Sequence, residues 1–303
     1  KDTGHYSNDL RYVLSLQNTI AAFEEIQTWE GYAKTPLHSL DSLASDIGVK
    51  NIYYKDESSR FGLGSFKALG GTYGVLKFIH HALKKEIGDE VSMKDIHAGK
   101  YSEQISKYTV TTATDGNHGR SVAFGAKLFG CKCQIYIHSE VSLGRQKAME
   151  DLEATVNRVS GNYDESLQIC IEDAGKNNWY VISDTSYEGY TKYPRYIMAG
   201  YNVMAEEIID QIKDRPLPTH VFLQGGVGSF PGAICGYFWE KFPGNNIKFV
   251  VVESEHAPCL IRSAQNNQMT SVNIKQETMM AGLSCGEPSL LGWKILKSGT
   301  DDF

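Results

Sequence analysis

The stretch Ser65-Phe66-Lys67-Ala68-Leu69-Gly70-Gly71 holds a single lysine between an aromatic residue and a pair of glycines. Residues 51–55 before it are typical of a strand, and the apolar spacing after residue 74 predicts a buried helix face. Lys67 would then lie in the first turn of a helix, where the helix dipole disfavours the ammonium form. A partly neutral lysine is a nucleophile for carbonyl carbons, and Schiff-base formation is its natural use. The alternative is an ordinary surface lysine, but Phe66 and the glycines favour a position in a cleft.

A second turn, Thr114-Asp115-Gly116-Asn117-His118-Gly119, joins an expected strand to an expected helix. Its two glycines expose backbone N–H groups at a helix N-terminus, which suits a carboxylate or a phosphate. Asp115 adds a base or acceptor, and Asn117 adds an amide that can face a ligand. An Asx turn with a helix cap explains the same residues about equally well. We expect His118, one residue from the helix start, to be structural rather than catalytic.

A third turn, Gln224-Gly225-Gly226-Val227-Gly228-Ser229, follows a strongly apolar strand. Three glycines and a serine form a nest of N–H groups that suits a phosphate, whereas a tight turn alone does not require three glycines. A dinucleotide-binding turn would require glycine at position 231, where the chain has Pro231. Glu253, at the end of the next strand, keeps that alternative open because it could hold a ribose.

Together these turns predict one cofactor. Pyridoxal 5′-phosphate requires a lysine for its aldehyde, a nest for its phosphate, and a site for the carboxylate of an amino acid. A nicotinamide oxidoreductase would leave the Lys67 motif unexplained. We therefore expect this cofactor and a small amino-acid substrate. No metal site is expected, since His80 and His81, as neighbours, point to different helix faces.

Alternating strands and helices would position these turns. Strands are expected at residues 108–112, 133–137, 155–159, 180–182, 220–223 and 248–252, and helices at 118–130, about 143–153, about 160–176, from Pro194 onward, and 229–241. Such alternation predicts an α/β fold with mostly parallel sheets and helices on both faces. Ligands bind at the carboxyl ends of strands in these sheets, where the three turns lie. Residues 88–107 are polar and poorly periodic, so we expect a connection or domain boundary there.

Composition excludes several classes of protein. The chain has 303 residues, 41% hydrophobic and 22% charged, which suffices for one large domain or two. A net charge of −6 argues against nucleic acid and anionic membranes as partners. The apolar runs are too short to span a bilayer, and no signal peptide is visible. Six cysteines are too few for a disulfide scaffold, so a cytoplasmic, mostly reduced protein is expected.

The three turns resemble those of the fold-type II, or tryptophan-synthase-like, pyridoxal-phosphate enzymes. Within that group the chain looks most like the diaminopropionate ammonia-lyases, and serine or threonine dehydratases usually carry serine at the Asp115 place. The resemblance covers about residues 32–293. Its further marks are Thr114-Asp115-Gly116-Asn117-His118-Gly119-Arg120, Asp184-Thr185-Ser186-Tyr187-Glu188-Gly189-Tyr190, Arg262-Ser263 and Met280-Ala281-Gly282-Leu283-Ser284-Cys285-Gly286-Glu287-Pro288.

The resemblance implies a role for each matched residue. Lys67 would be the Schiff-base lysine, with Phe66 beside the cofactor, and Asn117 would hydrogen-bond the phenolic oxygen. Thr114 and Asn117 would lie near the substrate carboxylate, while Asp115 and Asp184 would contact the substrate as catalytic carboxylates. The residues expected to hold the phosphate are Gly225, Gly226, Val227, Gly228 and Ser229.

The implied architecture is two α/β domains, each with a mostly parallel sheet and helices on both faces, with the active site between them. We expect residues 1–104 and 196–303 in a large cofactor-binding domain and residues 105–195 in a small one. The group places a hydroxyl or thiol near the pyridine nitrogen from a strand close to its C-terminus. We expect that residue to lie beyond Phe303, in a missing part of the large domain. A homodimer is typical of the group and is expected here.

The implied reaction is the α,β-elimination of 2,3-diaminopropionate to pyruvate and ammonia. The substrate amine displaces Lys67, a base removes the α-proton, and the β-amine leaves, which requires its protonation by a nearby acid. Lys67 would be the base on one face and Asp115 on the other, which predicts turnover of both D and L isomers. The alternatives are a serine or threonine dehydratase, which Asp115 and Asp184 disfavour, and a catalytically inactive relative that binds the cofactor.

Overall fold

The computed structural model describes residues 5–114, 116–161, 163–276 and 278–303. Two parallel sheets, one with the strand order β5-β4-β3-β6 and one formed by β7 and β8, carry the fold, and β1 and β2 form a small antiparallel pair. The strands are β1 (Leu37–Ser39), β2 (Tyr53–Lys55), β3 (Thr109–Ala113), β4 (Lys132–His138), β5 (Thr155–Val159), β6 (Tyr180–Val181), β7 (His220–Gln224) and β8 (Lys248–Val252). The predicted α/β class with mostly parallel pairing is confirmed.

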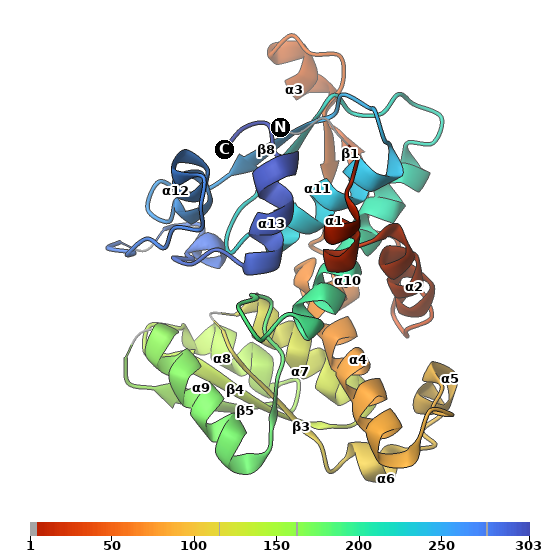
Figure 1. Cartoon of the computed structure of the whole chain (residues 1–303), viewed down its shortest axis with the longest axis vertical. Helices are drawn as coiled ribbons and strands as arrows, with labels where there is room; N and C mark the ends of the chain where they lie inside the picture. Colours follow the sequence, from red (N-terminus) through yellow and green to blue (C-terminus); the bar gives the residue numbers. More distant parts are fainter. Residues whose placement is uncertain (1–4, 115, 162, 277) are drawn as a thin grey trace.

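Helices surround both parallel sheets. The four-stranded sheet lies with α4, α7, α8 and α9 in one half of the molecule, while β8 lies with α11, α12 and α13 in the other, and α10 runs between the halves (Figure 1). None of the described helices is both long enough and apolar enough to cross a membrane. The helices are α1 (Asn8–Val13), α2 (Leu16–Ile26), α3 (Asp41–Asp46), α4 (Lys67–Ile87), α5 (Met93–His97), α6 (Ser102–Ile105), α7 (Asn117–Phe129), α8 (Leu143–Glu150), α9 (Tyr163–Asn177), α10 (Lys192–Gln211), α11 (Ser229–Lys241), α12 (Cys259–Asn266) and α13 (Leu290–Gly299), with 3-10 turns at Arg60–Gly62 and Ala281–Leu283.

Residues 88–107 are more ordered than the predicted connection. They form α5 and α6, and the side chains of Val91, Ile96, Tyr101 and Ile105 are buried in the main core. Each of these short helices buries a single apolar residue, Ile96 in α5 and Ile105 in α6, which is too few to produce a periodic signal. The proposed domain division after residues 104 and 195 stays a prediction.

The glycine pair near Lys67 allows α4 to pack closely on two other helices. A Cβ atom on Gly70 would collide with the ring of Tyr201 in α10, and one on Gly71 would collide with Ser121 in α7. The glycines therefore serve close approach between helices, because any larger side chain would push the elements apart. This packing fixes the N-terminus of α4, where Lys67 lies.

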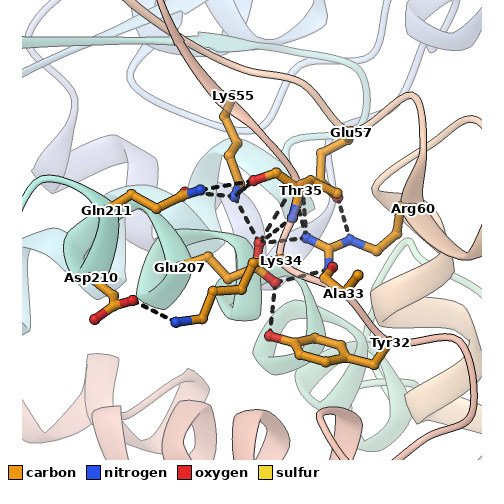
Figure 2. A network of polar contacts seen from close by, with 10 residues as sticks. All are labelled: Tyr32, Ala33, Lys34, Thr35, Lys55, Glu57, Arg60, Glu207, Asp210 and Gln211. Carbon is orange, nitrogen blue, oxygen red and sulfur yellow. Dashed lines mark hydrogen bonds and ion pairs between the residues drawn. The ribbon is translucent and has the colours of Figure 1, made fainter.

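A buried charge cluster anchors the loop that leads to Lys67 (Figure 2). We call it the Glu207 cluster, and it contains Thr35, Lys55, Glu57, Arg60 and Glu207. The Arg60 guanidinium donates to Glu57 Oε1 and Glu207 Oε2, both at 2.8 Å, and Lys55 Nζ donates to Glu207 Oε2 at 2.7 Å. The cluster ties the segment before β1, the strand β2 and the following loop to α10.

The loop continues from this anchor toward the lysine. The Arg120 guanidinium of α7 donates to the Leu63 carbonyl at 2.8 Å. Gly64, next to it, takes a φ of +70°, which is the left-handed region that favours glycine. Lys67 therefore follows a loop that is held from α10 at one end and from α7 at the other.

Candidate active site

Lys67 is the first residue of α4, as predicted, and its amine is ion-paired with the Asp184 carboxylate. Asp184 follows β6 in the chain, and the two side chains are 24% and 16% exposed, respectively. The pair thus lies at the boundary of the interior, where a small ligand could reach the amine. The carboxylate favours the ammonium form of Lys67, so it opposes the influence of the helix dipole.

His118 is the third member of this group. Its ring is buried, its Nε2 lies 2.8 Å from the Ile182 carbonyl oxygen, and its Nδ1 lies 3.7 Å from Asp184 Oδ2. Burial lowers the pKa of His118 despite the nearby carboxylate, so the imidazole is neutral near pH 7. The expected structural role accounts for the bond to Ile182, but it does not account for the approach to Asp184.

Asp184 stays ionised in this setting. Burial raises the pKa of its carboxyl, whereas charge at His118 and Lys67 lowers it, and the lowering prevails, so the pKa lies well below its ordinary value. Because His118 is neutral, we assign the lowering to the Lys67 ammonium. We call Lys67, His118, Asp184 and Tyr201 the Asp184 cluster.

Tyr201 and Phe66 complete the wall around these groups. The Tyr201 hydroxyl is buried and has no hydrogen-bond partner among the described residues. Burial and the charge of Asp184 raise the pKa of Tyr201 well above its ordinary value. Phe66 packs edge-on against Tyr201 with ring centroids 5.1 Å apart and lies 4.4 Å from the ring of Phe230. Phe66, predicted to lie beside the cofactor, is thus held next to Lys67 by aromatic packing.

The turn from β3 to α7 is closed by Thr114. Its Oγ1 accepts the N–H groups of Gly116 at 3.0 Å and Gly119 at 3.1 Å. These two glycine N–H groups are engaged within the turn, so they are not among the N–H groups that a ligand could reach there. Asn117, the first residue of α7, is exposed, as a ligand-facing amide would be. Asp115, predicted as a catalytic base, lies outside the described residues.

The glycine loop between β7 and α11 has the form of an anion cradle. Gly225 extends the sheet by donating to the Val252 carbonyl at 2.8 Å, and Gly228 takes a left-handed φ of +99°. Within the described part of the chain, the N–H groups of Gly226, Val227 and Gly228 donate no backbone hydrogen bond. Three amides left open just before a helix N-terminus suit a phosphate group.

The Ser229 hydroxyl connects this loop to Asp184. It donates to the Asp184 carbonyl at 2.6 Å and lies 3.0 Å from Ser289 Oγ. The loop predicted to hold phosphate and the carboxylate beside Lys67 are therefore held in one hydrogen-bonded unit. These interactions bring together residues from α4, α7, the segment after β6 and the start of α11.

Sequence reasoning missed two serines that support this unit. Ser186 Oγ and Ser289 Oγ lie 2.7 Å apart and buried, and the Ser289 N–H donates to the Val227 carbonyl at 2.6 Å. Ser186 belongs to the Asp184–Tyr190 motif, and Ser289 directly follows the Met280–Pro288 motif. Their positions in or beside these motifs are the only signal that the sequence offers for them. Their spatial pairing, 103 residues apart, could not be derived from either motif.

Glu253 has a structural role that disfavours dinucleotide binding. Its Oε1 accepts the Leu260 N–H at 2.9 Å and its Oε2 accepts the Ile261 N–H at 2.8 Å. The carboxylate thus satisfies the first turn of α12. Both oxygens are engaged within the chain, so the acid is not available to hold a ribose.

The described residues fit pyridoxal phosphate. An amine that can reach an aldehyde lies on the same hydrogen-bonded unit as three open amides that can receive a phosphate. A side chain at Gly225 would press against Val251, Glu253 and Leu260, so a larger residue there would force these neighbours to shift. An amine nucleophile and open N–H donors in one site suit a ligand that carries both an aldehyde and an anionic group.

Comparison with known proteins agrees with this chemistry. Residues 28–303 match the family model described as "Pyridoxal-phosphate dependent enzyme". The chain is 40% identical over 276 residues to the diaminopropionate ammonia-lyase of Salmonella typhimurium, covering 90% of this chain and 68% of that protein. It is 38% identical over 274 residues to the Escherichia coli enzyme of the same name, with the same two coverages.

A solved structure shares the fold over nearly the whole chain. It is the Escherichia coli diaminopropionate ammonia lyase in complex with an aminoacrylate-PLP azomethine reaction intermediate. The TM-score is 0.84 at 37% sequence identity, with 95% of this chain and 71% of that chain covered.

Proposed function

The chain belongs to the pyridoxal-phosphate-dependent enzymes and, within them, to the diaminopropionate ammonia-lyases, and we propose that it converts 2,3-diaminopropionate to pyruvate and ammonia by α,β-elimination. The observation that carries this proposal is the Asp184 carboxylate, which is held ionised beside the Lys67 amine. An anionic group there suits a substrate with a second amine, whereas serine and threonine offer only a neutral hydroxyl.

Pyridoxal 5′-phosphate is the cofactor, and when bound it supplies an aldehyde for amines and an electron sink for the charge left by the α-proton. Lys67, at the start of α4, would bind that aldehyde. The amides of Gly226, Val227 and Gly228, with Gly225 and Ser229 at either end, would hold the phosphate. Phe66 packs beside Lys67, and Asn117 reaches the site from α7.

Asp184 recognises the second amine of the substrate. The carboxylate pairs with the Lys67 ammonium. Were Lys67 engaged with an aldehyde, the same carboxylate would be available to the second amine of the substrate. Thr114 and Asn117 lie at the α7 end of the site, where the substrate carboxylate binds.

Two bases serve the two faces of the α-carbon. Lys67 takes the proton from one isomer and Asp115 takes it from the other, so both D- and L-diaminopropionate are substrates. Asp115→Asn is expected to lower kcat for one isomer by about 10²-fold or more and to leave the other within about threefold, because a positioned base contributes about 10²–10⁴-fold. Steady-state assays with the separate isomers measure this, and equal losses for both would contradict the two-base division.

The reaction itself is tested by product stoichiometry. The protein is incubated with pyridoxal phosphate and, separately, with L-diaminopropionate, D-diaminopropionate, L-serine or L-threonine, and keto acid and ammonia are measured. Twice as much ammonia as keto acid from diaminopropionate, with little from the hydroxy acids, is the expected result. Preferential turnover of serine or threonine would make the chain a dehydratase, and a bound cofactor without turnover would make it an inactive relative.

Asp184→Asn tests the recognition of the second amine. The substitution keeps the shape of the side chain and removes its charge, so kcat/KM for diaminopropionate should fall about 10²–10³-fold. Any residual turnover of D- or L-serine should change much less, because a hydroxyl gains nothing from the charge. A loss of equal size for both classes of substrate would show that Asp184 does not select the amine.

The chain is further proposed to act in the cytoplasm as a homodimer, as the resemblance implies. Analytical ultracentrifugation of the purified protein tests the second point, and a sedimenting monomer would contradict it.

A further inference from the structure

His118 is fixed in one tautomer by its surroundings. The Ile182 carbonyl oxygen can only accept a hydrogen bond, so His118 Nε2, 2.8 Å away, carries the hydrogen. In the neutral imidazole the other nitrogen, Nδ1, is then a lone-pair acceptor. The side chain is 5% exposed, so water does not satisfy that nitrogen.

His118 Nδ1 faces another acceptor. It lies 3.7 Å from Asp184 Oδ2 and has no hydrogen-bond partner within the described ranges of the chain. A buried acceptor without a donor costs about 1–3 kcal/mol. Only a proton held between the nitrogen and the carboxylate can satisfy both atoms.

The Lys67 ammonium compensates the charge of the Asp184 carboxylate, but it leaves His118 Nδ1 without a donor among the described residues. It is ion-paired with Asp184, and its positive charge opposes protonation of His118. The proposed function requires the Lys67 nitrogen to bind an aldehyde, so the ammonium must lose a proton and leave the carboxylate. Asp184 then lacks its cation.

Among the described residues that face this carboxylate, only His118 can take up a proton near neutral pH. Lys67 reaches it from α4, and Tyr201, from α10, remains a neutral hydroxyl because burial and Asp184 raise its pKa. Tyr190, from the same segment as Asp184, already donates to the Val181 carbonyl at 3.0 Å and accepts the Ser183 N–H at 2.9 Å.

We propose that His118 is the positioning partner of Asp184, and that a proton shared by His118 Nδ1 and the Asp184 carboxylate replaces the Lys67 ammonium once that amine is engaged. This inference rests on the proposed function and deepens it. The proton released by Lys67 is kept at the site rather than lost to water. The β-amine enters this step neutral: when the bond from the β-carbon to the β-nitrogen breaks, its electron pair leaves with the nitrogen, and this proton passes through Asp184 to that nitrogen, so the product is ammonia.

The proton can be observed in the full chain without turnover. Nitrogen-15 NMR of the histidines follows their titration, with the His118 signals assigned by their loss in His118→Gln. In the wild type without added cofactor, the pKa of His118 should lie below 6.5, the ordinary histidine value, because the ring is buried. In Lys67→Met, its pKa should rise by about 1 or more, a roughly tenfold gain in proton affinity.

Two further measurements keep this test decisive. The double variant Lys67→Met/Asp184→Asn should lose the rise, because the carboxylate that shares the proton is gone. Pyridoxal phosphate added to the wild type engages Lys67 without any substitution and should produce the same rise, which covers the case of a Lys67→Met variant that fails to fold. His80, whose Nε2 lies 3.0 Å from the Val91 carbonyl oxygen, is the internal control and should keep its midpoint.

Kinetics separate a proton-holding role from a structural one. His118→Gln can keep the hydrogen bond to Ile182 but cannot take up a proton, so elimination should slow about 10²-fold and kcat should lose the pH limb that belongs to His118. The urea midpoint should stay near that of the wild type. A wild-type pH profile in His118→Gln, or a His118 pKa that does not rise when Lys67 is engaged, overturns the proposal. If diaminopropionate is turned over but the pKa of His118 does not rise, only this inference is overturned. If the pKa of His118 rises but diaminopropionate is not turned over, the proton shared by His118 and Asp184 is supported and the proposed elimination is overturned.

Discussion

Two charge clusters lie at the two ends of the same loop, and they differ in how fully their atoms are bonded. In the Glu207 cluster, both carboxylate oxygens of Glu207 are engaged, Oε1 by Tyr32 and Arg60 and Oε2 by Arg60, Lys55 and Thr35 (Figure 2). Two cations face two carboxylates, and Arg60 and Glu207 are 1% and 0% exposed.

The Asp184 cluster is bonded incompletely. One carboxylate faces Lys67 and His118, while His118 Nδ1 and the Tyr201 hydroxyl lack hydrogen-bond partners among the described residues. A cluster with every atom bonded has one arrangement and serves to fix the chain. A cluster with spare donors and acceptors can exchange partners, which a site that binds a cofactor and moves protons requires.

The largest effect that this comparison predicts is on activity. Lys67→Met should abolish turnover of diaminopropionate, by at least about 10⁴-fold, because the residue that binds the aldehyde and removes one α-proton is lost. The free energy of unfolding should change by only about 1 kcal/mol, since His118 can take over as the partner of Asp184. Single-turnover kinetics and urea unfolding of the same preparation measure the two effects.

A chemical control identifies the lysine directly. Borohydride reduction of the wild type with pyridoxal phosphate should attach the cofactor to the peptide that contains Lys67, and mass spectrometry of a digest locates it. Attachment to Lys55 or Lys77 instead would assign the cofactor to another part of the molecule. A large loss of stability in Lys67→Met would place the Asp184 cluster in the same class as the Glu207 cluster and remove the distinction.

The second largest effect should fall on stability. Glu207→Gln leaves an amide N–H₂ group facing the buried cations Arg60 and Lys55. Removing one partner of a buried ion pair costs about 3–5 kcal/mol, because the remaining charge is left without compensation. Urea unfolding should show this loss, while kcat per folded molecule should change by less than about tenfold, since the cluster does not touch the reacting groups.

Asp210→Asn is the matched control on the same helix. Asp210 lies three residues after Glu207 and pairs with Lys34 at the surface, where both side chains are about half exposed (Figure 2). Its urea midpoint should match that of the wild type. If Glu207→Gln were as mild as Asp210→Asn, full bonding would not mark a structural cluster in this protein.

The sequence predicted the α/β fold well because its strands are short apolar runs separated by turns with glycine. All six strands expected between residues 108 and 252 are present within two residues of their predicted ends. The short helices α5 and α6 were missed because few apolar residues carry their packing. The glycine pair was expected to admit a close neighbour, but the identity of that neighbour, Tyr201 on one side and Ser121 on the other, depends on α10 and α7 together.

The site was predictable where a motif lies in one turn and not where segments meet. The Lys67 turn and the glycine loop each announce their chemistry through neighbouring residues. The bond from Ser229 to the Asp184 carbonyl and the approach of His118 to Asp184 join segments at least 45 residues apart. Local patterns carry no information about such pairs, so His118 was expected to be only structural.

The smallest predicted effect concerns the exposed ion pair of Lys34 and Asp210, beside the Glu207 cluster. It tests whether an ion pair here stabilises the fold through its charge alone or only when it is buried. Lys34 and Asp210 have opposite charges and direct contact, as Arg60 and Glu207 do, but their side chains are 45% and 53% exposed rather than buried. Water solvates both ions when they separate, and two long side chains lose rotamer freedom when they pair. Lys34→Met should therefore leave the urea midpoint unchanged within error, and the Lys34→Met/Asp210→Asn pair should show no coupling. A clear coupling would mean that contact alone stabilises this edge of α10, and burial would no longer explain why Glu207 is fixed in place.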